Sequence, residues 1–119
     1  MKRLFLATAI WLVSLPALSA NLLMVEQPGC IYCAKWNAEI SHIYPKTDEG
    51  RRAPLLRVDL HDLPEDIDFA SRPVFTPTFV LVEDGKELGR MEGYAGDEFF
   101  WFILGKLLDD NEIEAGTDP

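Results

Sequence analysis

The chain has 119 residues, of which 48% are hydrophobic and 26% are charged. This is enough apolar sequence to build the core of one domain, so the composition excludes a disordered protein. Twenty acidic side chains against eleven basic ones give a net charge of −9 at pH 7. Phosphate backbones repel such a domain, and we expect no nucleic acid among its partners.

The first twenty residues have the order of a secretory signal peptide. The start is basic, residues 4–15 are almost wholly apolar, and small residues surround Ser19 and Ala20. We therefore expect residues 1–20 to be a cleavable signal peptide, cut near Ser19–Ala20, in an exported protein. An uncleaved anchor is the alternative, although the apolar stretch is short for a membrane span of about 20 residues. Loss of the two basic residues would change the net charge to −11, because nine basic residues would face twenty acidic ones.

Residues 22–25 form a short apolar run, which predicts a buried strand. A helix is expected to begin at Cys30 and to end before Pro45. Residues 47–52 are polar and predict a loop, and residues 55–60 predict the second strand. The apolar face of the first helix is expected at Cys33, Trp36, Ile40 and Ile43.

The second half of the chain begins with an acidic connector at residues 64–71, for which we expect one or two helical turns. A strong strand follows at 78–82, and Asp84-Gly85 predicts a hairpin turn to a partner strand at 87–93. Gly96-Asp97-Glu98 would cap a last helix that ends at about Leu108, and the polar chain from Asp109 onward is expected to fray.

This order of elements predicts an α/β domain. The strand–helix–strand of the first half implies parallel pairing, and the hairpin of the second half implies antiparallel pairing with a covering helix. We therefore expect a mixed central sheet flanked by helices over residues 21–110, followed by a polar C-terminal tail at 111–119.

Cys30 and Cys33 are the only cysteines, and they lie at the junction of a strand and a helix. At a helix N-terminus the backbone N–H groups and the helix dipole stabilise a thiolate, which lowers the pKa of the Cys30 thiol. Cys33 would lie one turn later with its sulfur buried. This arrangement predicts a redox-active pair in which Cys30 attacks a substrate disulfide and Cys33 resolves the mixed disulfide.

The cysteine pair is compatible with uses other than catalysis, and the sequence separates them. A structural bridge that closes only four residues stabilises a fold by about 2 kcal/mol on the chain-entropy estimate, so it is a weak staple. Haem attachment is excluded because Ala34, not histidine, follows the second cysteine. The spacing of His42 and His61 matches no zinc finger, so no metal site is expected. A Cu(I)-handling protein that uses both thiolates is the remaining alternative.

Thr76-Pro77 stands directly before the strongest strand. Proline cannot donate a hydrogen bond within a sheet, so it belongs at a strand start or an edge. A cis bond there would expose the backbone of Thr76, with which an extended substrate peptide could pair while its disulfide lies against Cys30. An ordinary trans proline that starts a strand is the alternative.

Taken together, these motifs resemble the thioredoxin superfamily over essentially the whole chain after the signal peptide. The resemblance rests on Cys30-Ile31-Tyr32-Cys33, on Thr76-Pro77 and on Gly93. It implies the thioredoxin fold, a nucleophilic Cys30, a resolving Cys33, a cis Pro77 and no cofactor beyond the disulfide. Substrate-binding positions are implied at Gly29, Ile31, Tyr32, Thr76, Pro77 and Gly93.

The family has a buried aspartate where this chain has Met24, so Glu26 is the candidate acid or base for the resolving thiol. Within the superfamily, the chain resembles the small periplasmic thioredoxins of bacterial sulfur-oxidation systems, the SoxS kind. That likeness implies a periplasmic reductase of an exported protein thiol, such as that of a sulfur-carrier protein, and a membrane thiol transporter as its electron donor. We expect the protein to be a monomer. Ile31 and Tyr32 add no positive charge beside the thiolate, which favours reduction over oxidation of substrates.

Residues 99–104 are apolar on every side of the expected last helix. Such a helix is usually buried, and in a domain of this size one side of it must face water or a partner. Packing in the core is one interpretation, and a docking face is the other. A non-catalytic docking module built on this helix is accordingly a third function class.

Overall fold

The computed structural model describes residues 3–10 and 20–115. Most of the signal peptide predicted for residues 1–20, including Ser19, lies outside the described residues, as do the last four residues of the tail. Residues 3–10 form no helix or strand, and the side chains of Leu4, Phe5 and Leu6 are about nine-tenths exposed. Residues 3–10 therefore contribute nothing to the core of the domain.

Four strands form one mixed sheet with the order β2-β1-β3-β4. β1 (Asn21–Glu26) pairs in parallel with β2 (Leu55–Asp59) and antiparallel with β3 (Thr78–Glu83), which in turn pairs antiparallel with β4 (Lys86–Glu92). The predicted mixed sheet is confirmed. Asp84 and Gly85 both have positive φ angles, of 54° and 72°, as the two-residue hairpin turn requires.

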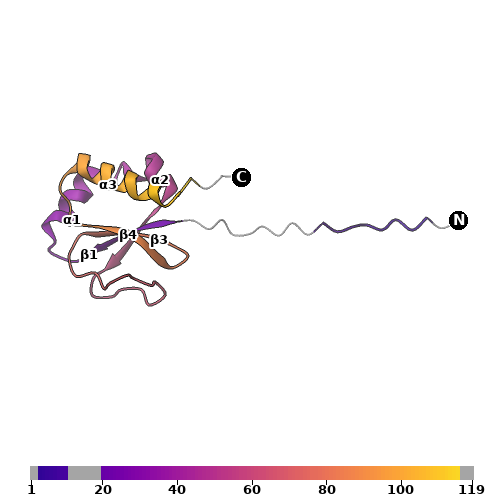
Figure 1. Cartoon of the computed structure of the whole chain (residues 1–119), viewed down its shortest axis with the longest axis horizontal. Coiled ribbons are helices and arrows are strands. Elements are labelled where there is room, and N and C mark those ends of the chain that lie inside the picture. Colours follow the sequence, from indigo (N-terminus) through magenta and orange to yellow (C-terminus); the bar gives the residue numbers. More distant parts are fainter. Residues whose placement is uncertain (1–2, 11–19, 116–119) are drawn as a thin grey trace.

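The helices lie over one face of this sheet (Figure 1). α1 (Ile31–Trp36) continues into a π-helical turn, η1 (Asn37–Ser41), and then into a short 3-10 turn, η2 (Tyr44–Lys46). α3 (Asp97–Asp110) lies over the same face and contacts β4. The helix that was expected to begin at Cys30 is thus present, but it changes its hydrogen-bond pattern after Trp36.

β1 is buried on both faces, which explains its unbroken apolar sequence. Leu22 and Met24 point into the larger core cluster, beneath the helices, where the aromatic rings of Trp36, Phe79 and Phe100 also meet. Leu23 and Val25 belong to a second cluster on the opposite face of the sheet.

The loop predicted for residues 47–52 is wrong. Residues Asp48–Arg52 form the short helix α2, and the hydroxyl of Thr47 caps it by accepting a hydrogen bond of 3.0 Å from the backbone N–H of Gly50. Two acidic residues in its first turn and two basic residues in its last turn also complement the helix dipole. The polar composition that suggested a loop is therefore a set of helix-terminal signals.

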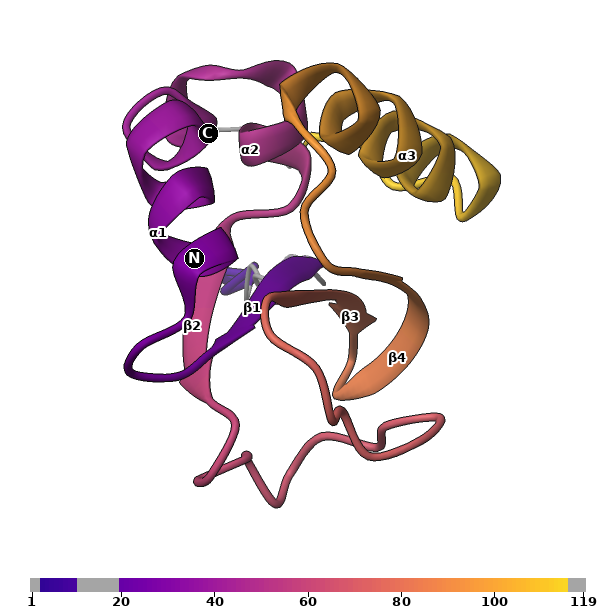
Figure 2. The ribbon, with the colours of Figure 1, turned by 90° about the vertical axis from the view of Figure 1, so that its left-hand side faces the viewer.

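The helical turns predicted for residues 64–71 are absent, and an irregular segment covers the second face of the sheet instead. Figure 2 shows this long segment between β2 and β3 passing beneath the sheet. Ile67 and Phe69 pack against the smaller cluster, and Asp68 exchanges backbone hydrogen bonds with Gly85 and Glu87. The backbone N–H and carbonyl of Asp68 are thus bonded to the β3–β4 hairpin and are not available for the hydrogen bonds of a helix.

The expectation that the chain frays from Asp109 is wrong for the first part of the tail. α3 ends at Asp110, and Ile113 is 4% exposed in the core. The side chain of Arg52 donates a hydrogen bond of 2.6 Å to the carbonyl of Ile113, which ties the described part of the tail to α2.

Candidate functional site

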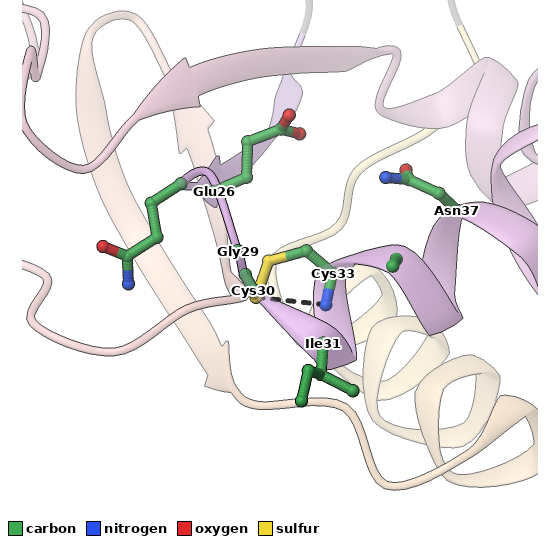
Figure 3. A pocket seen from close by; sticks show the side chains of 8 residues that line it. Glu26, Gly29, Cys30, Ile31, Cys33 and Asn37 are labelled. Carbon is green, nitrogen blue, oxygen red and sulfur yellow. Dashed lines mark hydrogen bonds between the residues drawn. A yellow bond between two sulfur atoms is a disulfide. The ribbon is translucent and has the colours of Figure 1, made fainter.

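Cys30 and Cys33 are joined in a disulfide at the start of α1. Cys30 is the N-cap residue of this helix, and its sulfur accepts a hydrogen bond of 3.1 Å from the backbone N–H of Cys33 (Figure 3). Cys33 is 5% exposed and belongs to the core cluster, whereas Cys30 is only partly buried. The two sulfurs therefore differ in accessibility, and a substrate meets Cys30 first.

The turn before the helix delivers Cys30 to the surface. Gly29 has a φ of 80°, a conformation that residues with a side chain rarely adopt, and a Cβ atom at this position would meet no neighbouring atom within 4 Å. The backbone N–H of Cys30 closes this turn with a hydrogen bond of 3.3 Å to the carbonyl of Gln27. Figure 3 shows Gly29 beside the disulfide, with Ile31 pointing outward from the first turn of α1.

The second predicted segment lies beside this turn. The Thr76–Pro77 bond is cis, and the carbonyl of Pro77 accepts a hydrogen bond of 2.7 Å from the backbone N–H of Gly93. The side chain of Gln27 donates to the hydroxyl of Thr76 at 2.8 Å. Segments far apart in the sequence thus meet at one end of the sheet, as the sequence motifs predicted.

Exposed apolar side chains lie on both of these segments. Ile31 and Tyr32 are 79% and 58% exposed, and Val74 and Phe75, just before Thr76, are 63% and 61% exposed. No hydrogen bond within the described residues uses the backbone N–H or carbonyl of Thr76. The site therefore offers an open backbone edge with apolar side chains beside it.

Glu26 lines the same pocket as the disulfide, together with Asn37 (Figure 3). Its carboxylate forms an ion pair of 2.6 Å with Arg57 on β2. Arg57 also donates a hydrogen bond of 2.8 Å to the side-chain oxygen of Asn37. The carboxylate that the sequence suggested is therefore at the site, but a cation holds it on the side of Asn37.

Arg57 is a site residue that sequence reasoning missed. Its guanidinium lies 3.6 Å from the sulfur of Met24 and 5.9 Å from the centre of the Trp36 ring. The parallel register of β1 and β2 pairs Met24 with Arg57, and the sequence alone does not give this register. His61 was also missed as a member of the site, because its link to Gln27 at 3.1 Å depends on the course of the turn after β2.

The aromatic helix α3 is divided between core and surface. Phe100 and Leu104 are buried, and the Phe100 ring lies within 5.7 Å of the rings of Trp36, Phe79 and Trp101. Phe102 is 67% exposed on the opposite side. Core packing accounts for one side of this helix, while the other faces solvent.

Within residues 3–10 and 20–115, no three His, Cys, Asp or Glu side chains are grouped so that they could hold a metal ion. His42 and His61 in particular do not join the cysteines in such a group. A search of the described helices also finds none that is both long enough and apolar enough to cross a membrane.

Comparisons with known proteins agree with this fold. A family model described as a thioredoxin-like domain matches residues 19–108. The crystal structure of the periplasmic thioredoxin SoxS from Paracoccus pantotrophus, in its reduced form, is similar to this chain with a TM-score of 0.76 and 51% identity. That match covers 78% of this chain and 99% of the other. No curated protein sequence matches. The chain belongs to the thioredoxin-like family.

Proposed function

We propose that this protein is an exported thiol–disulfide oxidoreductase that reduces disulfides on other exported proteins. The observation that carries the proposal is the unequal pair of cysteines at the start of α1, with Cys30 accessible and Cys33 5% exposed. A disulfide that served only stability would not need one accessible sulfur at a helix N-terminus.

In the reaction, the reduced protein transfers two electrons to a substrate disulfide. The Cys30 thiolate attacks one substrate sulfur, which forms a mixed disulfide and releases the other substrate sulfur as a thiolate. The Cys33 thiolate then attacks Cys30, which closes the Cys30–Cys33 disulfide and releases the second substrate thiol. The proton lost by Cys33 must leave through the pocket that both cysteines line.

Glu26 is the proposed acceptor of that proton. Glu26 lines this pocket, and an ion pair of 2.6 Å between its carboxylate and the guanidinium of Arg57 holds the carboxylate there. Glu26→Gln should slow the release of substrate from the mixed disulfide more than it slows the first attack.

The proposed substrate is an extended peptide that carries the disulfide. The unused backbone groups of Thr76 can pair with such a peptide as a strand would, and Pro77 and Gly93 complete the edge. The exposed side chains of Ile31 and Tyr32 provide apolar contacts on the side of the helix. Gly29 leaves space for the substrate backbone near the sulfur.

The proposed location is the periplasm, after removal of residues 1–20. Two observations support it: the signal-peptide pattern of the sequence and the similarity to a periplasmic thioredoxin. In that compartment the proposed partners are a sulfur-carrier protein of a sulfur-oxidation pathway as substrate and a membrane thiol transporter as electron donor. We propose that the protein works as a monomer.

Trapping of the mixed disulfide tests this function. Cys33→Ser cannot complete the second step, so it should accumulate covalent adducts with exported proteins that dithiothreitol releases. Cys30→Ser retains a cysteine, but that cysteine is the buried one, and it serves as the matched control. Equal adduct formation by both variants would contradict the assigned roles, and full disulfide turnover by Cys30→Ser would refute the proposed reaction.

A further inference from the structure

Gln27 connects three segments that meet at the redox site. Its side-chain nitrogen donates a hydrogen bond of 2.8 Å to the hydroxyl of Thr76, and its side-chain oxygen lies 3.1 Å from Nε2 of His61. Its backbone carbonyl accepts the hydrogen bond from the N–H of Cys30. One residue therefore contacts the turn that presents Cys30, the segment before Pro77 and the turn after β2.

The directions of these hydrogen bonds are mutually consistent. Because the amide nitrogen of Gln27 donates to Thr76, the amide oxygen is the acceptor, and Nε2 of His61 must donate to it. His61 is itself held in place, since its backbone N–H donates to the Asp59 carboxylate at 2.7 Å. The preceding residue, Leu60, donates to the carbonyl of Glu26 at 2.9 Å. These two hydrogen bonds fix the backbone that carries the His61 imidazole, and the imidazole can therefore orient the side-chain amide of Gln27.

The bond between Gln27 and Thr76 spans the two sides of the proposed substrate site. In the described chain, no other side-chain hydrogen bond joins residues 27–30 to residues 74–77. Of the residues next to this bond, Pro28 and Phe75 are exposed, whereas Pro77 is buried. The pairing of β1 with β3 and the buried Pro77 bring Thr76 near the turn, and the bond from Gln27 is the one side-chain hydrogen bond in the described chain that then links this turn to Thr76.

We propose that Gln27 is a positioning residue that holds the backbone of Thr76 in register with Cys30, and that His61 fixes the amide in the orientation that makes this bridge. This inference rests on the proposed function, because it concerns how the same site aligns an extended peptide. The side chain of Gln27 forms no hydrogen bond with either sulfur among the described residues, so the proposed role is in docking and not in the chemistry of the disulfide.

Rates of disulfide reduction by the reduced protein test the inference, with two substrates that make different demands. One substrate is a peptide with a disulfide in an extended segment, and the other is 2,2′-dithiodipyridine, which has no backbone to align. Gln27→Met keeps the length of the side chain but removes both hydrogen bonds. It should lower the rate constant for the peptide about fivefold, the fold-change that corresponds to about 1 kcal/mol for one hydrogen bond. The rate with dithiodipyridine and the reduction potential should stay unchanged.

Gln27→Glu is the conservative rescue, because its two oxygens can accept hydrogen bonds from Thr76 and His61 at once. Its rate with the peptide should remain within about twofold of the original. His61→Ala should lower the peptide rate, whereas His42→Ala, at the other histidine, should not. His42 is also exposed, and no hydrogen bond of its side chain is found among the described residues.

Several outcomes would overturn the inference without affecting the proposed function. Equal losses with both substrates for Gln27→Met would mean that the residue acts on the sulfur chemistry or on folding. No loss with either substrate would mean that the bridge is unimportant, and failure of Gln27→Glu to restore the rate would exclude a simple bridge. If the unchanged protein reduces neither substrate, it is the proposed function that fails.

Discussion

Two phenylalanines of α3 allow the same substitution to be compared inside and outside the core. Phe100 is 1% exposed, and its ring packs against the aromatic rings of both the sheet and the first helix. Phe102 lies on the same helix and is 67% exposed. Replacement by alanine removes the same atoms and changes the helix propensity by the same amount at both positions, so burial is the main difference between the variants.

The expected costs differ severalfold. Phe100→Ala leaves a cavity among the rings of Trp36, Phe79 and Trp101, and truncations of this kind cost about 3–5 kcal/mol. In a domain of this size such a loss lowers Tm by roughly 15 °C or more. Phe102→Ala should change the free energy of unfolding by less than about 0.5 kcal/mol.

Urea unfolding followed by circular dichroism measures both values. If Phe100→Ala fails to fold, Phe100→Leu retains most of the volume and should still be clearly destabilised relative to the original protein. Similar losses for Phe100→Ala and Phe102→Ala would refute the assignment of one face of α3 to the core. A stable Phe102→Ala that no longer exchanges disulfides with its partner would point to a docking role for the exposed face.

The remaining predictions concern a second matched pair and the dependence of stability on pH. A Cβ atom at Gly50 would lie 1.8 Å from the carbonyl oxygen of Tyr44, so Gly50→Ala should destabilise the fold by about 2 kcal/mol in urea unfolding. Gly105→Ala meets nothing within 4 Å in α3, and it should instead stabilise by about 0.5–1 kcal/mol; losses of equal size would contradict this account. Arg90 lowers the pKa of the Glu87 carboxyl through their hydrogen bond. This ion pair stabilises the fold above the usual pKa of glutamate, and the stabilisation is lost as the pH falls through the lowered value. Glu87→Gln should therefore be less stable at pH 7 and show a flatter loss of stability between about pH 5 and pH 3, which thermal melts at several pH values can measure.

The parts of the fold that depend on local patterns could be predicted from the sequence. The apolar run of β1, the Asp84-Gly85 turn and the helix that starts beside Cys30 each follow from the periodicity or turn preference of adjacent residues. α2 was missed because five residues are too few to show a helical period, and its signals lie in the cap at Thr47 and in the charges of its ends.

The missed parts of the site depend on contacts between distant segments. Glu26 meets Arg57 across 31 residues of sequence, and Gln27 meets Thr76 across 49. The first contact requires the parallel register of β1 and β2, and the second requires the irregular segment that leads to Pro77. Neither the composition nor the spacing of motifs indicates which of these distant residues come into contact. The cysteines were found because both lie within one turn of one helix.

The direction of electron transfer is the central claim, and the reduction potential of the Cys30–Cys33 disulfide tests it most directly. Equilibration with glutathione buffers, followed by alkylation and mass spectrometry, gives this potential for the protein without residues 1–20. We expect a reducing value close to that of thioredoxin, about −270 mV, so that electrons flow from this protein to substrate disulfides. A value near about −120 mV would make the protein a disulfide donor and would contradict the proposed reductase.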